Sequence, residues 1–292
     1  MMRRLNISEK FFLFAAAFSA FCTLFVFVFM VWLALPVFRG GLFFQILTRP
    51  WLPDQGVYGI YPMIVGTGAI SLASVVFAFP LSLGCAAFIS GLAPERIGAY
   101  LRKTVRFMTG IPTVIYGFVG VFLLVPVVRE WFDGGSGLCI LSASILLAIL
   151  ISPTMILFFT DSFDRVPRSY LAAVDALGGS KVQKMLYVVL PYARQGVLTG
   201  TVLSLGRAVG DTLISLMIAG NAVAVPGSIL DSARTLTAHI ALVIAADFDS
   251  IEFRTIFACG IVLYGFTTLI VLLVQALGSW SRKPMRKHHD IR

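Results

Sequence analysis

Six long apolar segments dominate this sequence. A transmembrane helix needs about 20 apolar residues to cross a hydrocarbon core of roughly 30 Å, and each segment is long enough to do so. The chain is 58% hydrophobic and 13% charged, whereas soluble domains average about 25% charged residues. We therefore expect an all-α polytopic membrane protein of six transmembrane helices, with spans near 11–36, 61–92, 107–128, 138–160, 192–220 and 255–278.

The positions of Lys and Arg predict the topology. Of the 23 basic residues, 17 fall at the two termini and in the loops that follow the second and fourth segments. Five fall on the opposite side, and Arg207 lies inside the fifth segment. Because cytoplasmic loops carry an excess of Lys and Arg, we expect both termini and the 161–194 loop to be cytoplasmic. The net charge of +9 then reflects topology and gives no reason to expect a nucleic-acid partner.

The expected domain organisation is a single membrane domain. Residues 1–10 form a short cytoplasmic N-terminus, residues 11–278 the membrane domain, and residues 279–292 a basic cytoplasmic tail. The apolar run of the first segment is too long for a signal peptide, so we expect it to remain as an anchor. Segment 221–254 is expected outside, and its apolar stretch 236–246 is too short to span, which favours a surface or re-entrant helix.

The 161–194 loop contains the pattern of a short helix. Pro167 is favoured in a first helical turn and Gly178 is a natural stop, so we expect a helix of about three turns between them. One face of this helix is apolar, because its side chains recur at i, i+3, i+4 and i+7. That stripe consists of Tyr170, Ala173, Val174 and Leu177. A small apolar stripe on an exposed helix suits a groove on another protein, and the alternative is an ordinary interhelical loop.

Arg207 and Asp211 are the strongest candidates for a functional site. A charge at the middle of a membrane costs at least about 2.5–3.5 kcal/mol, so two charges need a reason. In a continuous helix their i, i+4 spacing would place them on one face. We expect Arg207 to line a permeation path and to bind an oxyanion through its planar fork, oriented by Asp211 and followed by Thr212. The alternative is an ion pair that only holds the fold.

Glycine and proline mark the expected close contacts and breaks between helices. Gly206 and Gly210 are spaced to let a neighbouring helix approach. Gly110, Pro112 and Gly117, near the start of the third segment, predict a distorted turn or another close approach. We also expect kinks or breaks at Pro80, Pro112, Gly200, Gly206 and Gly210, which lie inside long spans.

The loop resembles the EAA loop of ABC importer permeases, whose consensus is E-A-A-x3-G-x9-I-x-L-P. Aligned on Gly178, the nine-residue gap leads to Val188, Leu190 and Pro191 without an insertion. Ala172 stands where the consensus has Glu, and Val174 where it has the second Ala. The resemblance implies a type I (MetI-like) importer permease fold and a helix that docks on a separate ATPase. The docking residues carried over are Pro167, Tyr170, Ala172, Ala173, Val174, Leu177 and Gly178.

A second resemblance points to phosphate permeases. The segment Gly206–Thr212 is similar to the G-R-A-x-G-E-T motif of phosphate-specific permeases of the PstC type, with Asp211 one methylene shorter than the usual Glu. The segment Gly110–Gly117 is similar to their G-I-P-S-V-V-Y-G. The resemblance implies a phosphate importer in a bacterial or archaeal plasma membrane. Its implied partners are a homologous PstA-type permease, an ATPase dimer and an extracytoplasmic phosphate-binding protein, and a PstA-type assignment of this chain is the close alternative.

Three other functions stay open at this stage. A molybdate, tungstate or sulfate permease would keep the coupling loop but makes no particular demand for Arg207 beside an acid. An ion-coupled secondary transporter would use Asp211 to carry a proton. A non-transporting assembly protein would leave the charged pair unexplained.

Several kinds of site lack a motif in this sequence. Gly178-Gly179-Ser180-Lys181 is followed by Val182, so it cannot form a phosphate-binding P-loop. We expect no enzyme activity and no cofactor in this chain, with ATP bound by the partner. The four cysteines form no C-x-x-C pair, and nothing around His239, His288 and His289 suggests a metal site.

Overall fold

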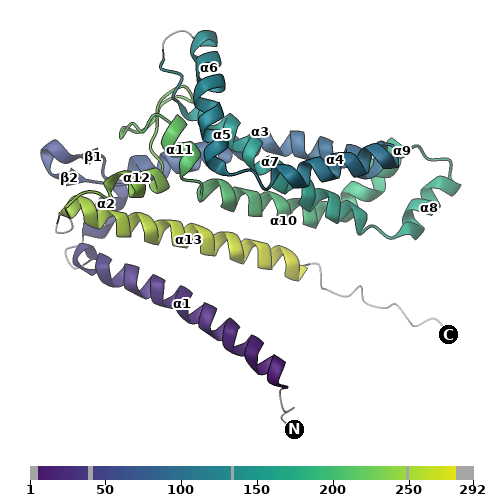
Figure 1. Cartoon of the computed structure of the whole chain (residues 1–292), viewed down its shortest axis with the longest axis horizontal. Helices are drawn as coiled ribbons and strands as arrows, with labels where there is room; N and C mark the ends of the chain where they lie inside the picture. Colours follow the sequence, from purple (N-terminus) through teal and green to yellow (C-terminus); the bar gives the residue numbers. More distant parts are fainter. Residues whose placement is uncertain (1–5, 39–41, 133–134, 248–249, 281–292) are drawn as a thin grey trace.

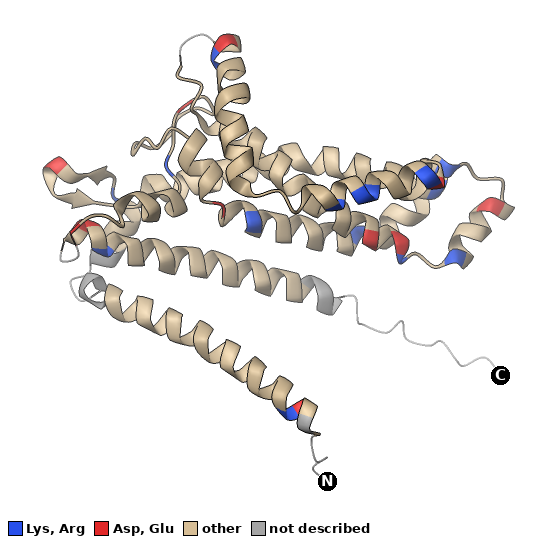
Figure 2. Cartoon of the chain, viewed as in Figure 1, with Lys and Arg blue, Asp and Glu red and all other residues tan. Residues whose placement is uncertain are grey.

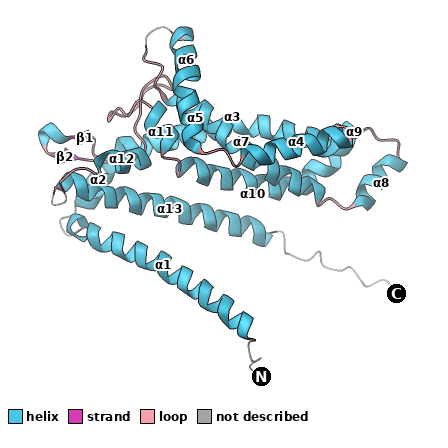
Figure 3. Ribbon diagram, viewed as in Figure 1, coloured by secondary structure: helices cyan, strands magenta, loops and turns pink. Residues whose placement is uncertain are grey.

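The computed structural model describes residues 6–38, 42–132, 135–247 and 250–280, and these fold into a helical bundle with one small β-hairpin (Figures 1 and 3). Six helical columns correspond to the six expected spans. They are α1 (Ile7–Phe38), α3 (Tyr61–Ala87), α5 (Thr113–Val119) with α6 (Val125–Trp131), α7 (Ile140–Asp164), α10 (Leu190–Val209) with α11 (Leu213–Ile218), and α13 (Ile251–Trp280).

Five helical stretches in the described chain are long and apolar enough to cross a membrane. They are Ser8–Ala34, Tyr61–Leu92, Thr113–Trp131, Ile140–Asp164 and Ile251–Ala276. The sixth column, α10, is more polar because it carries Arg194, Gln195 and Arg207 among its apolar residues. The polytopic all-α fold predicted from the apolar segments is therefore confirmed, with α10 as its least apolar member.

One expected span boundary is wrong. Residues 107–108 do not begin the third span; they end α4 (Glu95–Met108), an amphipathic helix that the apolar pattern did not predict. Pro112 stands immediately before α5. The residue that precedes a proline disfavours helical backbone, so α4 and α5 are separate helices. In the fifth span, the break expected at Gly210 is confirmed, since α10 ends at Val209 and α11 starts at Leu213.

Helix α7 forms the centre of the bundle, and most of its side chains are buried. Small residues let α3 and α10 approach it closely. On α10, a side chain at Gly196 would collide with Ser162, and one at Gly200 would collide with Phe158. On the α3 side, the Ser144 hydroxyl donates to the carbonyl of Ile70 at 3.3 Å. Small side chains and hydroxyl groups at helix contacts are typical of membrane bundles.

Helix α1 lies at the edge of the bundle and contacts mainly α13 (Figure 1). The rings of Phe27 and Tyr264 stack at 4.4 Å. Along most of its length α1 exposes large apolar side chains, including Phe14, Phe18 and Phe25. Such a helix is stable only where its outer face meets lipid or another apolar surface.

The two ends of the bundle differ (Figure 1). One end carries α8 (Arg168–Ala176) and α9 (Lys181–Lys184), and α1 begins and α13 ends toward this side. Lys and Arg gather here on α4, α8 and α9 (Figure 2). The other end carries α2 (Leu42–Thr48), the hairpin of β1 (Trp51–Leu52) and β2 (Val57–Tyr58), and α12 (Leu236–Val243).

Segment 221–254 contains a short helix, as its apolar stretch predicted. Helix α12 has eight residues, begins at a Thr235 cap, and is buried against α3, α11 and α13. It is therefore an internal helix of the bundle, and the surface placement that we considered for it does not hold.

Candidate functional site

Arg207 lies near the end of α10, half-buried, and its Nη1 donates a 2.7 Å hydrogen bond to the hydroxyl of Thr154 on α7. Thr154 follows Pro153, which lies inside α7. The guanidinium is within electrostatic range of the Tyr116 phenol on α5 and of Asp211. Arg207 thus lies among three helices, α5, α7 and α10.

Asp211 is not on the same helical face as Arg207, and the expected orienting pair is wrong on this point. Helix α10 ends at Val209, and Asp211, one residue before the N-cap Thr212, accepts the main-chain N–H of Ile214 through Oδ2 at 2.9 Å and so caps the first turn of α11. Aspartate is a preferred helix-capping residue because its carboxylate accepts otherwise unpaired N–H groups of a first turn. No salt bridge within the described part of the chain includes Arg207.

The main chain at this break also holds the short helix α12. The Thr237 hydroxyl donates to the carbonyl of Asp211 at 2.8 Å, and Asp211 itself is 9% exposed. Thr212 is half-buried, and its carbonyl accepts the N–H of Leu216 at 2.9 Å. The predicted trio of Arg207, Asp211 and Thr212 therefore spans a break between two helices. Arg207 is the cation of this trio, and no carboxylate among the described residues forms a salt bridge with it.

The glycines singled out in the sequence have different roles. A side chain at Gly117 would lie 2.6 Å from the Met217 sulfur on α11, so this glycine allows a close contact. A Cβ added at Gly206 would lie 3.4 Å from the Ile270 side chain of α13, an ordinary contact distance. Gly110 and Gly210 do not lie at helix contacts, because a Cβ there would meet only carbonyl oxygens of its own turn. These two positions are turns at helix ends, which the glycine spacing alone could not distinguish from contacts.

The helix expected in the 161–194 loop is present as α8 and projects from one end of the bundle (Figure 1). Pro167 precedes its first residue, and Gly178 adopts a φ of +72°, a left-handed conformation that favours glycine. The N–H of Gly179 closes the turn on the carbonyl of Val174 at 2.9 Å. The helix therefore ends in a turn at Gly178 and Gly179, where the sequence predicts its end.

The apolar stripe of α8 faces outward. Leu177 is 88% exposed and Tyr170 50% exposed, Ala172 and Ala173 are also exposed, and Val174 is half-buried. In contrast, Leu171 packs on the hydrophobic core. The helix thus has one face that holds it to the bundle and one apolar face that is largely exposed, with the Tyr170 ring meeting the ring of Tyr192 edge-on at 6.1 Å.

Sequence reasoning missed a polar cluster at the opposite end. Gly220 and Asn221 have φ values of +83° and +58°, and Arg234 Nε donates to the carbonyl of Asn221 at 3.1 Å. His239 is fully buried, with its ring 4.5 Å from that of Trp51 and its Nε2 3.2 Å from the Thr255 hydroxyl. Burial and the charge of Arg234 lower the pKa of His239 to about 4. These contacts connect α12 to the hairpin and to α13, and no local pattern predicts which of these residues meet.

Comparisons with known proteins agree with this architecture. Residues 82–283 match the family described as binding-protein-dependent transport system inner membrane component. The probable ABC transporter permease protein YqgH of Bacillus subtilis is 33% identical over 232 residues, which cover 78% of this chain and 75% of the relative. The phosphate transport system permease protein PstC of Pasteurella multocida is 31% identical over 249 residues, covering 78% of this chain and 77% of that protein.

Two solved structures share the fold at low sequence identity. A bacterial ABC transporter that imports alginate aligns with a TM-score of 0.61 at 13% identity, over 96% of this chain and 98% of that one. The MetNI methionine ABC transporter in an inward-facing conformation aligns with a TM-score of 0.55 at 17% identity, over 78% of this chain and 96% of that one. The chain therefore belongs to the family of binding-protein-dependent transport system inner membrane components, and it is a transporter subunit with the fold of ABC importer permeases.

Proposed function

We propose that this chain is a permease subunit of an ATP-driven phosphate importer, of the PstC type. Several relatives of about 30% identity, from bacteria and from the archaeon Methanocaldococcus jannaschii, carry the name phosphate transport system permease protein PstC. One observation in the structure carries the proposal: the guanidinium of Arg207 is held by a neutral hydroxyl and has no direct carboxylate partner among the described residues.

This arrangement suits an oxyanion. A guanidinium offers five N–H donors in a planar fork that matches phosphate, and it stays charged at all physiological pH values. The Thr154 hydroxyl uses one nitrogen of the fork, which leaves donors for a substrate. In a low-dielectric surrounding, a cation without a paired carboxylate attracts an anion more strongly than one that is already neutralised.

The break between α10 and α11 supports the same assignment. Discontinuous helices at membrane depth are tolerated where they are buried in protein or line a cavity, and in transporters they commonly form substrate sites. Here the break lies directly beside Arg207, and the Asp211 cap satisfies the first turn of α11. We infer that phosphate passes beside this break, with Arg207 as its main contact and Thr212 as a neighbouring path residue.

Coupling to ATP is assigned to the apolar face of α8. In this proposal a homologous permease of the PstA type completes the path and a dimer of ATPases receives α8 in a groove. An extracytoplasmic binding protein delivers phosphate to the hairpin end. ATP is bound by the partner, and this chain holds no cofactor. Movement of the docked helix shifts the bundle between outward-open and inward-open states, which requires contacts that differ between the two states.

This assignment places both termini and the α8 end on the cytoplasmic side, in agreement with the bias of basic residues. Single cysteines at Lys181 and at Asp54, each in a cysteine-free chain, can be tested with an impermeant maleimide on intact cells. We expect Asp54→Cys to react and Lys181→Cys to stay unlabelled. The reverse pattern would invert the topology and remove the coupling role of α8.

The decisive experiment for the substrate is uptake by the complete complex in vesicles. We expect ATP-dependent uptake of labelled phosphate that excess unlabelled phosphate suppresses and equal sulfate, molybdate or tungstate does not. Preferential suppression by one of those other oxyanions would instead assign the importer to it. Uptake that needs no ATPase but follows a proton gradient would favour the secondary-transporter alternative.

A further inference from the structure

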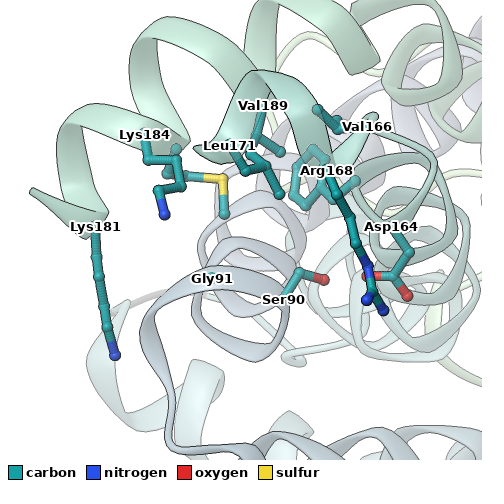
Figure 4. A pocket seen from close by; sticks show the side chains of 11 residues that line it. Ser90, Gly91, Asp164, Val166, Arg168, Leu171, Lys181, Lys184 and Val189 are labelled. Atoms are coloured by element: carbon teal, nitrogen blue, oxygen red, sulfur yellow. The ribbon is translucent and has the colours of Figure 1, made fainter. Parts of the chain in front are cut away.

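A cavity of about 430 Å³ lies behind α8, on the side opposite its exposed stripe (Figure 4). Its apolar side is formed by core residues that include Phe163, Leu171 and Met185. Its polar side is formed by Ser90, Asp164, Arg168, Lys181 and Lys184. The cavity therefore joins the end of the second span, the end of α7, α8 and the start of the α10 column.

The charges around this cavity are unbalanced. Asp164 forms a salt bridge with Arg102, whose Nη2 lies 3.3 Å from its second oxygen. Lys184 binds both oxygens of Asp175, at 2.6 and 2.7 Å. Among the salt bridges of the described residues, none includes Arg168 or Lys181. The single carboxylate of the lining is thus already paired with Arg102, and two cations of the lining form no salt bridge among the described residues.

The two cations lie on different walls. Figure 4 shows Arg168 beside Asp164 on one side of the cavity and Lys181 with Lys184 on the other, with Ser90 and Gly91 between them. Arg168 belongs to α8 and Lys181 to α9. An anion placed between them would therefore connect α8 to the rest of the bundle.

The backbone that borders the cavity is itself unusual. Two π-helical turns, Phe88–Leu92 and Met185–Val189, meet there. They lie in close contact, because a side chain at Gly91 would displace the terminal methyl group of Met185. Single π-helical turns inside α-helices frequently mark functional sites, and here both contribute residues to one cavity.

We propose that this cavity binds a phosphate group, carried either by a soluble anion or by the headgroup of an anionic lipid. Arg168 supplies the bidentate fork and Lys181 a second positive charge, the pairing that phosphate groups favour. The Ser90 hydroxyl lies between them as a further polar group. The apolar side of the cavity accommodates the uncharged part of a larger ligand.

Binding at this place restrains α8 from behind, while its exposed stripe stays free. The consequence for transport rests on the proposed coupling role of α8, but binding itself does not. A ligand that holds α8 against the bundle stabilises the state in which it binds. The exchange between the two coupled states, and with it ATP-driven uptake, then becomes slower. The site is separate from Arg207, which lies beyond the middle of α10.

Protection of a reporter cysteine tests the proposal directly. The full-length chain carries Ser90→Cys with its four native cysteines replaced, and is placed in nanodiscs of phosphatidylcholine alone or with phosphatidylglycerol. Labelling by a maleimide is followed with inorganic phosphate or with chloride at equal ionic strength, which removes simple screening as an explanation. We expect several-fold slower labelling either with inorganic phosphate in both membranes, which assigns a soluble ligand, or with phosphatidylglycerol alone, which assigns a lipid.

A matched pair of variants shows whether the named cations are responsible. Arg168→Gln with Lys181→Gln removes two charge-assisted contacts, so the ligand concentration needed for protection rises at least about tenfold. Arg165→Gln with Arg194→Gln removes the same charge from exposed neighbours that do not line the cavity, and leaves protection unchanged. Arg168→Lys with Lys181→Arg keeps both charges and retains protection even if the neutral pair folds poorly.

Two results would overturn this assignment. One is equal labelling rates in all membranes and buffers, which leaves the cavity without a phosphate ligand. The other is protection that is the same in the neutral pair and in the control pair. Neither result bears on phosphate uptake through Arg207, so failure of this inference and failure of the proposed function are distinguishable.

Discussion

The charged residues at the α10–α11 break and those near α8 have different kinds of partner. At the break, Arg207 binds a neutral hydroxyl and Asp211 binds a main-chain N–H. Near α8, Arg102 pairs with Asp164 and Lys184 pairs with Asp175. The side chains of the Arg102–Asp164 pair are 29% and 45% exposed, whereas Asp211 is 9% exposed.

This difference sets the expected energetic scale of each region. Exposed ion pairs contribute about 0–1 kcal/mol because water competes for both charges. A buried polar group that loses its partner costs about 1–3 kcal/mol, since no water replaces the lost contact. The stability of the fold should therefore depend little on the ion pairs at the α8 end and more strongly on the buried contacts at the break.

The largest effect is expected at Arg207. Arg207→Ala should abolish phosphate uptake, and Arg207→Lys, which keeps the charge but loses the planar fork, should reduce it by tenfold or more, about 1.4 kcal/mol of substrate binding. Uptake is measured in vesicles and normalised to assembled complex. Near-normal uptake by Arg207→Ala would eliminate this residue as a required substrate contact.

The double change Arg207→Ala with Asp211→Ala addresses the alternative that the two residues form only a structural ion pair. A purely structural pair predicts that the double variant regains both assembly and transport. Because Asp211 caps α11 and does not pair directly with Arg207, we expect no rescue of transport.

The next largest effect is expected on the exposed stripe of α8. Ala173→Glu places a charge without a partner in the proposed apolar groove, and Gly178→Pro forces a φ near −65° where the chain has +72°. Both changes should leave insertion intact and lower ATPase co-purification together with uptake. Ser169→Glu, which adds the same charge to an exposed position of the same helix off the stripe, serves as the control. Normal co-purification and uptake in Ala173→Glu would contradict the docking role.

A moderate effect is expected from the cap at Asp211. Asp211→Ala removes the acceptor of the Ile214 N–H and should lower stability by about 0.5–2 kcal/mol. Asp211→Asn keeps an acceptor oxygen and should retain most of the stability and of the transport. The measurement is thermal unfolding of the purified complex together with uptake. If Asp211→Asn loses transport while it stays stable, the carboxylate charge has a role beyond the cap.

The smallest effect is expected from the ion pair near α8. Arg102 and Asp164 are both partly exposed. The hydrogen bond to Asp164 raises the pKa of the Arg102 guanidinium. Arg102→Gln should change stability by no more than about 1 kcal/mol, and high salt should reduce that change further. A loss as large as that of Asp211→Ala would show that exposed charges at this end matter as much as buried ones.

Much of the fold follows from local patterns. Long apolar runs predict the spans, because only an internally hydrogen-bonded helix is stable in lipid. The α8 helix was predicted between Pro167 and Gly178, since those residues restrict the backbone whatever surrounds them. Helix α4 does not follow from the long apolar runs, because its apolar residues, such as Leu101 and Val105, are separated by basic ones.

Within the site, the residue types were identifiable but their partners were not. Arg207 and Asp211 stood out because charge inside an apolar segment is rare. Thr154 had only a weak signal, a polar residue after Pro153 in an apolar run, and nothing local linked it to α10. Gly110 and Gly210 carry the same residue type as Gly117, yet only Gly117 lies against another helix.

By itself, the sequence determined the class of protein, the number of spans, and the place of the α8 helix and its apolar stripe, because these depend on hydrophobicity and on local backbone preferences. Only the tertiary structure decided that Asp211 binds the first turn of α11, that Arg207 is held by Thr154, and that Arg168 and Lys181 face one cavity. These features depend on contacts between residues far apart in the chain. The spacing of residues along one helix carries no information about which neighbouring helix will supply their partners.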